Sequence, residues 1–280
     1  MPSSFRISIV RPPGYAHSDA FREVAETVLF GLRNLGYAVE LSENQITHTP
    51  RTIVLGAHML ARGAVDHLPP PTILYNLEQI DPKSEWLHGS LLDLIQRYTT
   101  WDYSSQNIAR LTSAGWGRQL VHVPIGYVPQ MTRIVSAPVQ DLDVLFYGSV
   151  NARRQAVLDE LIAAGLRVVT GFGIYGRERD QLIARAKVVL NIHYYDAAVP
   201  ETVRLSYLFA NRKAVVSETG PLEEIGALAH AAVYVPYEQL TRACIALLTH
   251  DTLRKQLEQQ AIGVMSQVKE EAILTSALAR

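Results

Sequence analysis

Residues 143–154 read Asp-Val-Leu-Phe-Tyr-Gly-Ser-Val-Asn-Ala-Arg-Arg, and this stretch decides the fold. The apolar run from Asp143 to Tyr147 predicts a buried strand, and Gly148 to Asn151 predicts a tight loop. The residues that follow, Arg153 to Ala164, have the pattern of a helix. A strand followed at once by a loop and a helix is the repeating unit of a parallel sheet. We therefore expect an α/β protein.

The same alternation of strand and helix runs through the whole chain. The strands expected in the first half are Phe5 to Val10, Ala38 to Leu41, Arg51 to Leu55, Thr72 to Asn76, Trp101 to Ser104 and Leu120 to Val123. The further strands expected in the second half are Leu166 to Thr170, Val188 to Ile192, Ala214 to Ser217 and Ala232 to Val235. The periodicity fades between Pro124 and Asp141, which predicts a linker.

The two halves predict two Rossmann-like, doubly wound domains that face a cleft. We place the domains at residues 1–130 and 131–280, the second with a surface helix over roughly Asp251 to Leu278 that packs along one domain or both. Ligands of such sheets bind at the carboxyl ends of the strands. Candidate site residues can therefore be sorted by whether they follow a strand or precede one.

Composition excludes several classes of protein. The chain has 280 residues, of which 48% are hydrophobic and 19% charged, an ordinary globular balance. Its net charge of −1 provides no general cationic surface for nucleic acid. No signal peptide or membrane-spanning stretch is visible, and the single cysteine, Cys244, suits a reducing compartment. We expect a cytoplasmic protein with at most peripheral membrane contact.

Two acidic residues form a D-x-D pattern, which holds a divalent ion in many sugar-transferring enzymes. Asp141 and Asp143 precede a strand, however, and the rule above then places them at the amino end of the sheet. We interpret them as solvated surface residues and predict no metal site.

A glycine-rich loop offers an alternative function. Gly171, Gly173 and Gly176 form G-x-G-x-x-G after a strand, and Asp196 follows about twenty residues later, as in dinucleotide-binding proteins. The fingerprint belongs to the first strand of its domain, whereas these glycines follow the second. A flexible loop is the favoured interpretation, and an NAD(P)-dependent oxidoreductase remains an alternative.

Several residues with anion-binding chemistry follow strands of the second half. The turn from Gly148 to Asn151 opens a helix that carries Arg153 and Arg154, an arrangement suited to a diphosphate. Three further residues belong to the same edge of the sheet: His193 after one strand, Arg204 in the next helix and Glu218 at the end of the next strand.

The region from Asp143 to about Val235 resembles the nucleotide-sugar-binding half of glycosyltransferases with the GT-B fold, especially bacterial proteins of the group-1 and CgeB-like type. The matching stretches are Phe146-Tyr147-Gly148-Ser149, Val189 to His193, and the run from Arg204 through Ala210 to Glu218. The resemblance implies that Gly148, Asn151 and Arg154 lie near a donor diphosphate, that His193 and Arg204 contact phosphate or sugar, and that Glu218 takes the ribose. Tyr175 and Tyr194 complete the expected donor site.

The resemblance implies an enzyme that moves a sugar from a nucleotide-diphosphate donor to a saccharide, lipid-linked or protein acceptor. We expect it to need no metal ion and no cofactor, with the nucleotide-sugar as co-substrate. The outcome, inverting or retaining, is left open; an inverting reaction would need a general base, for which we predict Glu78, after the strand that ends at Asn76, and second His17, in the first loop. The helix from Arg204 carries Tyr207 where these families usually have a glutamate. A non-catalytic scaffold related to glycosyltransferases is therefore a further alternative.

Overall fold

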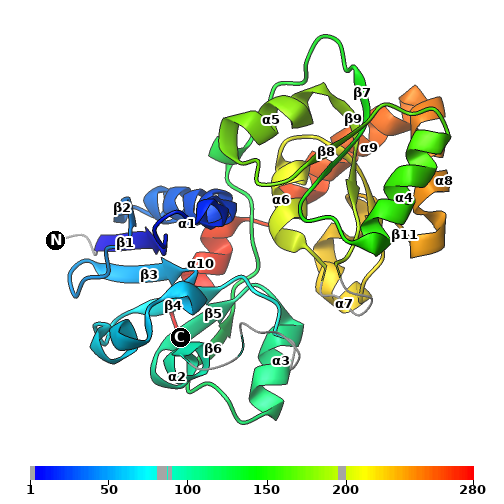
Figure 1. Cartoon of the computed structure of the whole chain (residues 1–280). Helices are drawn as coiled ribbons and strands as arrows, with labels where there is room; N and C mark the ends of the chain where they lie inside the picture. Colours follow the sequence, from blue (N-terminus) through cyan, green and yellow to red (C-terminus); the bar gives the residue numbers. More distant parts are fainter. Residues whose placement is uncertain (1–3, 81–86, 88–89, 195–199) are drawn as a thin grey trace. The chain divides into compact units, whose positions relative to one another are not determined.

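The computed structural model describes residues 4–80, 87, 90–194 and 200–280 of the chain. These residues divide into two compact units (Figure 1). Unit 1 comprises Met1–Val128 and Lys269–Arg280, and unit 2 comprises Pro129–Val268. Each unit is built on one parallel sheet, of six strands in unit 1 and five in unit 2. The expected α/β class with two doubly wound domains is confirmed.

Unit 1 alternates strands and helices. Its strands are β1 (Ser4–Ile9), β2 (Ala38–Glu43), β3 (Arg51–Leu55), β4 (Ile73–Asn76), β5 (Thr99–Asp102) and β6 (Leu120–His122). Its α-helices are α1 (Arg22–Asn34), α2 (Ser90–Arg97), α3 (Ser105–Ser113) and α10 (Glu270–Leu278). The expected strands are all present, and the ends of β5 differ most from the prediction. β5 ends at Asp102 because the Ser104 side chain accepts a hydrogen bond from the Asn107 amide and caps α3.

Unit 2 repeats the same alternation. Its strands are β7 (Leu142–Tyr147), β8 (Val168–Gly171), β9 (Ala186–Asn191), β10 (Ala214–Glu218) and β11 (Val233–Val235). Its α-helices are α4 (Ala152–Ala163), α5 (Gly176–Arg185), α6 (Thr202–Ala210), α7 (Leu222–Ile225), α8 (Leu240–Thr249) and α9 (Asp251–Met265). Each strand agrees with its expected position within two residues.

Strand order fixes where each unit can bind a ligand. The order is β2-β1-β3-β4-β5-β6 in unit 1 and β11-β10-β9-β7-β8 in unit 2. In unit 1 the chain places β2 on one side of β1 and then β3 on the other side. In unit 2 it places β8 on one side of β7 and then β9 on the other side. The order therefore reverses between β1 and β3 and between β7 and β9, and ligands bind at such switch points beyond the carboxyl ends of the strands.

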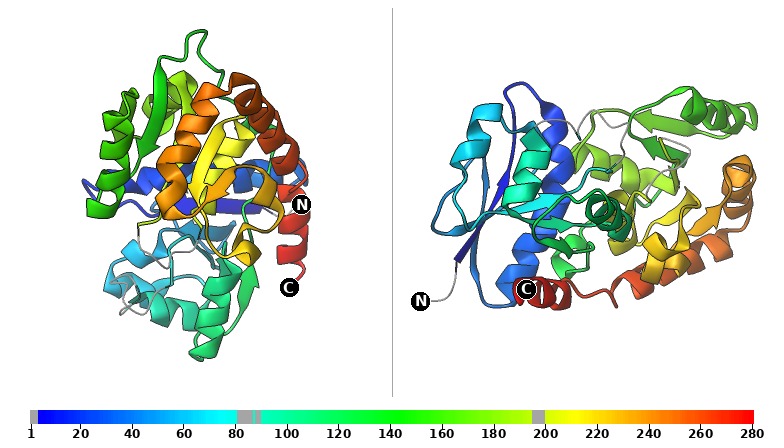
Figure 2. Two further views of the ribbon diagram at one scale, coloured as in Figure 1. Left: turned by 90° about the vertical axis from the view of Figure 1, so that its right-hand side faces the viewer. Right: turned by 90° about the horizontal axis from the view of Figure 1, so that it is seen from below.

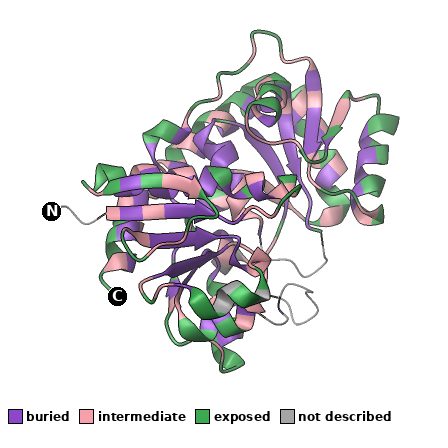
Figure 3. Cartoon of the chain, turned by 60° about the vertical axis from the view of Figure 1, so that its left-hand side comes forward, coloured by how far each residue is buried: buried purple, intermediate pink, exposed green. Residues whose placement is uncertain are grey.

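The strands of both sheets contribute to apolar cores that the helices cover. Figure 3 shows that the strands are mainly buried while the outer faces of the helices are exposed. In unit 2, Phe146 of β7 and Val188 of β9 pack with Leu158 of α4 and Cys244 of α8. Strands buried on both faces explain why these segments read as continuous apolar runs instead of alternating ones.

The carboxyl-terminal segment differs from the single surface helix that is expected to belong to the second domain and to pack along one domain or both. It forms two helices, and the second of them, α10, belongs to unit 1, where it packs against α1 (Figures 1 and 2). The break lies at Lys269, which is extended and forms a parallel bridge with Tyr127. The Glu270 amide donates to the Tyr127 carbonyl at 3.2 Å. Tyr127 lies where the chain leaves unit 1 for unit 2, and Lys269 lies where the chain returns to unit 1.

Glu270 is a fully buried carboxyl group at this crossing. Its Oε2 accepts the Gly126 amide at 2.7 Å, and its Oε1 has no hydrogen-bond partner among the described residues. A Cβ on Gly31 would lie 2.7 Å from the Glu270 side chain, so the glycine of α1 makes room for it. Burial raises the pKa of Glu270 from its usual 4.5 to about 8.

We expect Glu270→Gln to stabilise the protein increasingly as pH rises from about 5 to 8. The folded state holds the Glu270 proton over this range while the unfolded state has lost it, so the stability of the wild type falls with pH. The shift corresponds to a difference on the order of 4 kcal/mol between the two ends of the range. Urea unfolding at several pH values measures it, with Glu271→Gln as the control. Parallel stability curves for wild type and Glu270→Gln would contradict the assignment.

Candidate functional site

Four of the predicted donor-binding residues of unit 2 lie at or just beyond the carboxyl ends of neighbouring strands. Gly148 follows β7, His193 and Tyr194 follow β9, and Glu218 ends β10. Leu145 is level with Val189 in the β7–β9 pairing, so these strands end at the same edge of the sheet. The loops after β7 and β9 therefore flank the switch point of unit 2.

Gly148 has a conformation and an environment that favour glycine. Its φ of +132° is a backbone region that other residues rarely adopt. A Cβ at this position would lie 2.9 Å from Arg204 Nη2 and 3.8 Å from Arg154 Nη1. The bare backbone of the turn thus allows two guanidinium groups to come close to the loop at the start of α4.

Arg154 is largely occupied by the protein itself. Its side chain is only 3% exposed and donates to the carbonyls of Ile192 and Ser149. Asn151 caps α4 by accepting the Arg154 amide at 2.9 Å, and its Nδ2 donates to the Tyr194 carbonyl. The structure therefore gives Arg154 and Asn151 a clear role in joining the loops after β7 and β9. Their predicted contact with a diphosphate stays a prediction.

Arg204 is the more accessible of the two arginines. Its side chain is 17% exposed, lies over the Tyr147 ring at 4.9 Å and donates to Asn191 Oδ1 at 3.0 Å. Glu201, just before α6, contacts both guanidinium groups. Its Oε1 lies 2.8 Å from Arg154 Nη2 and its Oε2 lies 2.7 Å from Arg204 Nη1. Sequence reasoning missed Glu201, although it directly precedes a helix that carries Arg204.

Glu218 is held by a third arginine, Arg153. Arg153 forms a two-point ion pair with its carboxylate and lies over the Tyr237 ring at 3.9 Å. The same carboxylate accepts the His193 amide at 3.0 Å. Burial lowers the pKa of His193, whose Nε2 has no hydrogen-bond partner among the described residues. A neutral histidine and a paired carboxylate therefore lie together where β9 and β10 end.

Tyr207 lies one turn after Arg204 and is 5% exposed. Its hydroxyl accepts from Arg133 Nε at 2.9 Å and donates to Asp180 Oδ2 at 2.8 Å. The guanidinium of Arg179 lies over its ring at 4.5 Å. Tyr207 thus ties α6 to α5 and to the segment that follows Met131, a structural role that the sequence did not predict.

The glycine-rich loop follows β8, on the side of β7 opposite to the switch point, and the Gly171 carbonyl accepts the Gly148 amide at 2.8 Å. Gly171 ends β8, the edge strand next to β7, and Gly176 begins α5 after Tyr175. A dinucleotide fingerprint belongs to the first strand, which here is β7. Asp196, the acidic residue of the proposed fingerprint, lies outside the described residues. The position on an edge strand favours the interpretation as a loop over a nicotinamide site.

The D-x-D aspartates lie at the amino end of β7. Asp141 pairs with Arg185 at 2.6 Å, and Asp143 pairs with Arg167 at 3.1 Å and with Lys187 at 2.8 Å. The hydrogen bonds from Arg185 lower the pKa of Asp141 to about 2. Across the described part of the chain, no group of three or more His, Cys, Asp or Glu side chains is placed to hold a metal ion.

In unit 1, a buried polar network fixes the loop that carries Glu78. Asn76 Nδ2 donates to Asp102 Oδ2 at 2.7 Å, and Asn107 Nδ2 donates to Asp102 Oδ1 at 3.0 Å. Both amide groups also donate to the Glu78 carbonyl at 2.9 Å. This network positions the Glu78 backbone just beyond β4, and burial raises the pKa of the Glu78 carboxyl.

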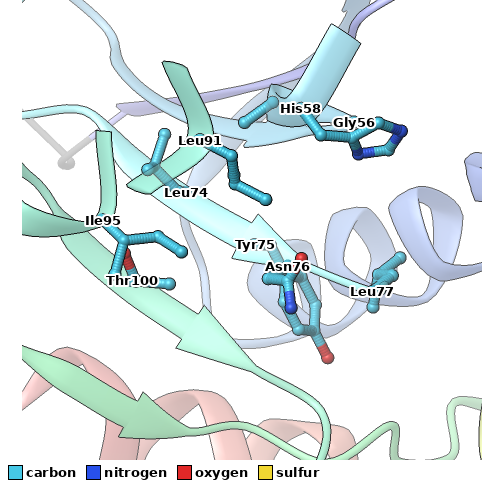
Figure 4. A pocket seen from close by; sticks show the side chains of 10 residues that line it. Gly56, His58, Leu74, Tyr75, Asn76, Leu77, Leu91, Ile95 and Thr100 are labelled. Carbon is cyan, nitrogen blue, oxygen red and sulfur yellow. The ribbon is translucent and has the colours of Figure 1, made fainter. Parts of the chain in front are cut away.

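A histidine that sequence reasoning missed lies beside Glu78. His58 Nε2 is 3.8 Å from Glu78 Oε1, and burial lowers the pKa of His58 to about 4. His58 and Leu77 line a pocket whose wall includes Leu91 and Ile95 of α2 (Figure 4). His58 follows β3 as Glu78 follows β4. The rule that ligands bind beyond the carboxyl ends of the strands, which we call the strand-end rule, could therefore have found His58.

His17, the second predicted base, lies in the 3-10 helix that precedes α1, Ala16–Phe21. Its ring packs edge-on against Tyr15, with 5.3 Å between the ring centroids. The histidine that the structure places beside Glu78 is His58, and the role of His17 stays a prediction.

No protein-family model matches the chain. Among curated proteins, it is 28% identical over 191 residues to uncharacterized protein L140 of Acanthamoeba polyphaga mimivirus, covering 64% of this chain and 59% of that protein. It is 26% identical over 187 residues to protein L137 of the same virus, covering 60% of this chain and 25% of that protein. The matches thus span less than two thirds of the length of these relatives.

Solved structures match both units. HepE of Anabaena in complex with UDP and glucose gives a TM-score of 0.64 at 12% identity, covering 99% of each chain. T4 phage BGT in complex with its UDP-glucose substrate gives 0.57 at 13% identity, covering 99% of each. AviGT4, a glycosyltransferase involved in avilamycin A biosynthesis, gives 0.57 at 16%, covering 100% of this chain and 98% of that one. The chain therefore has the GT-B fold, with two parallel-sheet α/β domains.

Proposed function

We propose that the protein is a glycosyltransferase that moves a sugar from a nucleotide-diphosphate donor to an acceptor. The observation that carries the proposal is the pair of guanidinium groups, Arg154 and Arg204, at the Gly148 turn beside the switch point of unit 2. Guanidinium groups and the amino terminus of α4 together suit a diphosphate. The complexes of HepE with UDP and glucose and of BGT with UDP-glucose make a uridine diphosphate sugar the first donor to test.

In the proposed reaction each unit has a separate task. Unit 2 binds the donor, and Arg204 with the start of α4 stabilises the negative charge on the departing diphosphate. This stabilisation needs no metal ion. Unit 1 binds the acceptor, and the Glu78 carboxylate removes the proton from the attacking hydroxyl group. The neutral His58 next to it adds no positive charge that would lower the basicity of Glu78.

The wider setting is also part of the proposal. We place the enzyme in the cytoplasm with a saccharide, lipid-linked or protein acceptor and no nucleic-acid partner. The near-neutral net charge supports the absence of nucleic acid, and the lone cysteine supports the compartment. Among the described residues, the helices are all too short or too polar to cross a membrane.

Calorimetric titration separates the proposed function from its alternatives. We expect UDP to bind and NAD to bind at least about tenfold more weakly, because the two guanidinium groups lie at Gly148, after the first strand of unit 2, whereas the dinucleotide fingerprint follows the second strand. Preferential binding of NAD would instead favour an oxidoreductase. A protein that binds UDP but leaves every donor intact would be the non-catalytic scaffold.

A further inference from the structure

One carboxylate neutralises part of the proposed donor site. Glu201 bridges the two arginines, with one oxygen 2.8 Å from Arg154 and the other 2.7 Å from Arg204. Its side chain is 18% exposed and makes no capping hydrogen bond to α6, at whose start it lies. The ion pairs with the two arginines are therefore the interactions that the structure gives for this side chain.

The two guanidinium groups also have other hydrogen-bond partners besides Glu201. Arg154 is also held by the Ile192 and Ser149 carbonyls, and Arg204 by Asn191 Oδ1. Each of these partners is uncharged. Burial lowers the pKa of Arg154, and the positive charge of Arg204 lowers it further. Removal of Glu201 would leave two like charges close together with neutral partners. An anion that contacts both would relieve this repulsion.

We infer that Glu201 is an internal substitute for the diphosphate, which a donor must displace in order to reach Arg154 and Arg204. The inference rests on the proposed function. One carboxylate leaves the two arginines with a net charge of +1, whereas the diphosphate of a sugar donor carries two negative charges and neutralises both. The need to displace Glu201 thus selects a dianionic ligand over a monoanionic one. Breaking the ion pairs of Glu201 also costs free energy, so stronger pairs mean a lower affinity for the donor.

Glu201→Gln tests this inference because glutamine keeps the size and one acceptor oxygen but loses the charge. We expect the variant to bind both UDP and inorganic pyrophosphate more tightly than wild type, on the order of tenfold at low ionic strength. The control is Asp159→Asn, which removes one negative charge from an exposed position on α4. Its affinity for both anions should equal that of wild type.

The outcomes separate this inference from the proposed function. In one outcome, Glu201→Gln binds pyrophosphate more tightly than wild type does, while neither protein binds UDP more tightly than pyrophosphate. This result would support the role of Glu201 and contradict the proposal that the donor is a nucleotide-sugar. If wild type binds UDP and Glu201→Gln binds it equally or more weakly, the role of Glu201 is wrong. Absence of any anion binding by both proteins would also overturn it.

Folding of the variant must be checked separately. Cooperative thermal unfolding near the wild-type temperature shows that the variant folds without the ion pairs of Glu201. If Glu201→Gln does not fold, Glu201→Ser is measured in the same way. Failure of both variants to fold would contradict the inference, because it would make the carboxylate a structural requirement and not a displaceable group.

Discussion

Glu78→Gln is expected to lower the turnover of the nucleotide-sugar roughly 10²- to 10⁴-fold, the contribution of a general base. Glutamine fits the same space beside His58 but cannot accept the proton of the acceptor hydroxyl. UDP affinity should remain at the wild-type value because the residues proposed to bind the donor belong to unit 2. Steady-state turnover with calorimetry on the same preparation measures both quantities.

The control for this variant is Asp66→Asn, which breaks an exposed ion pair with Arg97 in the same unit. Such a surface pair contributes little to stability, so turnover should not change. Burial raises the pKa of Glu78, so the rate should fall on the acidic side at a higher pH than for an ordinary glutamate. Wild-type turnover in a folded Glu78→Gln protein would eliminate Glu78 as the base.

Arg204→Ala is expected to weaken UDP binding by roughly 1.5 to 3 kcal/mol, the range for a hydrogen bond to a charged group. This corresponds to a loss of about 10- to 150-fold in affinity. Arg204 is a cleaner probe than Arg154, because Arg154 also holds the carbonyls of Ile192 and Ser149 and its loss would disturb both loops. Calorimetry measures the affinity, and thermal unfolding checks the fold.

Arg185→Ala is the matched control for Arg204→Ala. It removes one positive charge from the same unit, but at the amino end of the sheet, where Arg185 pairs with Asp141. Its UDP affinity should equal that of wild type. An unchanged affinity in a folded Arg204→Ala protein would remove Arg204 from the donor site.

Local patterns predicted the fold because each strand lies in a sheet that is buried on both faces. The segment around Phe146, for example, could only be an interior strand followed by the Gly148 turn. The position of α10 could not be predicted, because an amphipathic pattern does not reveal which core a helix covers. Its return to unit 1 depends on the buried contacts of Glu270 with Gly126 and Gly31, which are far apart in sequence.

The site was predictable as a set of loops but not as a set of contacts. The strand-end rule brought Gly148, His193 and Glu218 to one edge, and the same rule would have found His58. Pairing is different, because it depends on side-chain reach across loops. Neither the ion pair of Arg153 with Glu218 nor the bridge from Glu201 follows from the spacing of these residues along the chain.

The most direct test of the proposed glycosyltransferase activity is the release of nucleoside diphosphate from a panel of nucleotide-sugars, beginning with UDP-glucose. We predict that the wild-type protein releases the diphosphate from at least one donor, with or without transfer to an added acceptor, and that Arg204→Ala slows this release. Every donor remaining intact after long incubation with folded wild-type protein would contradict the proposal.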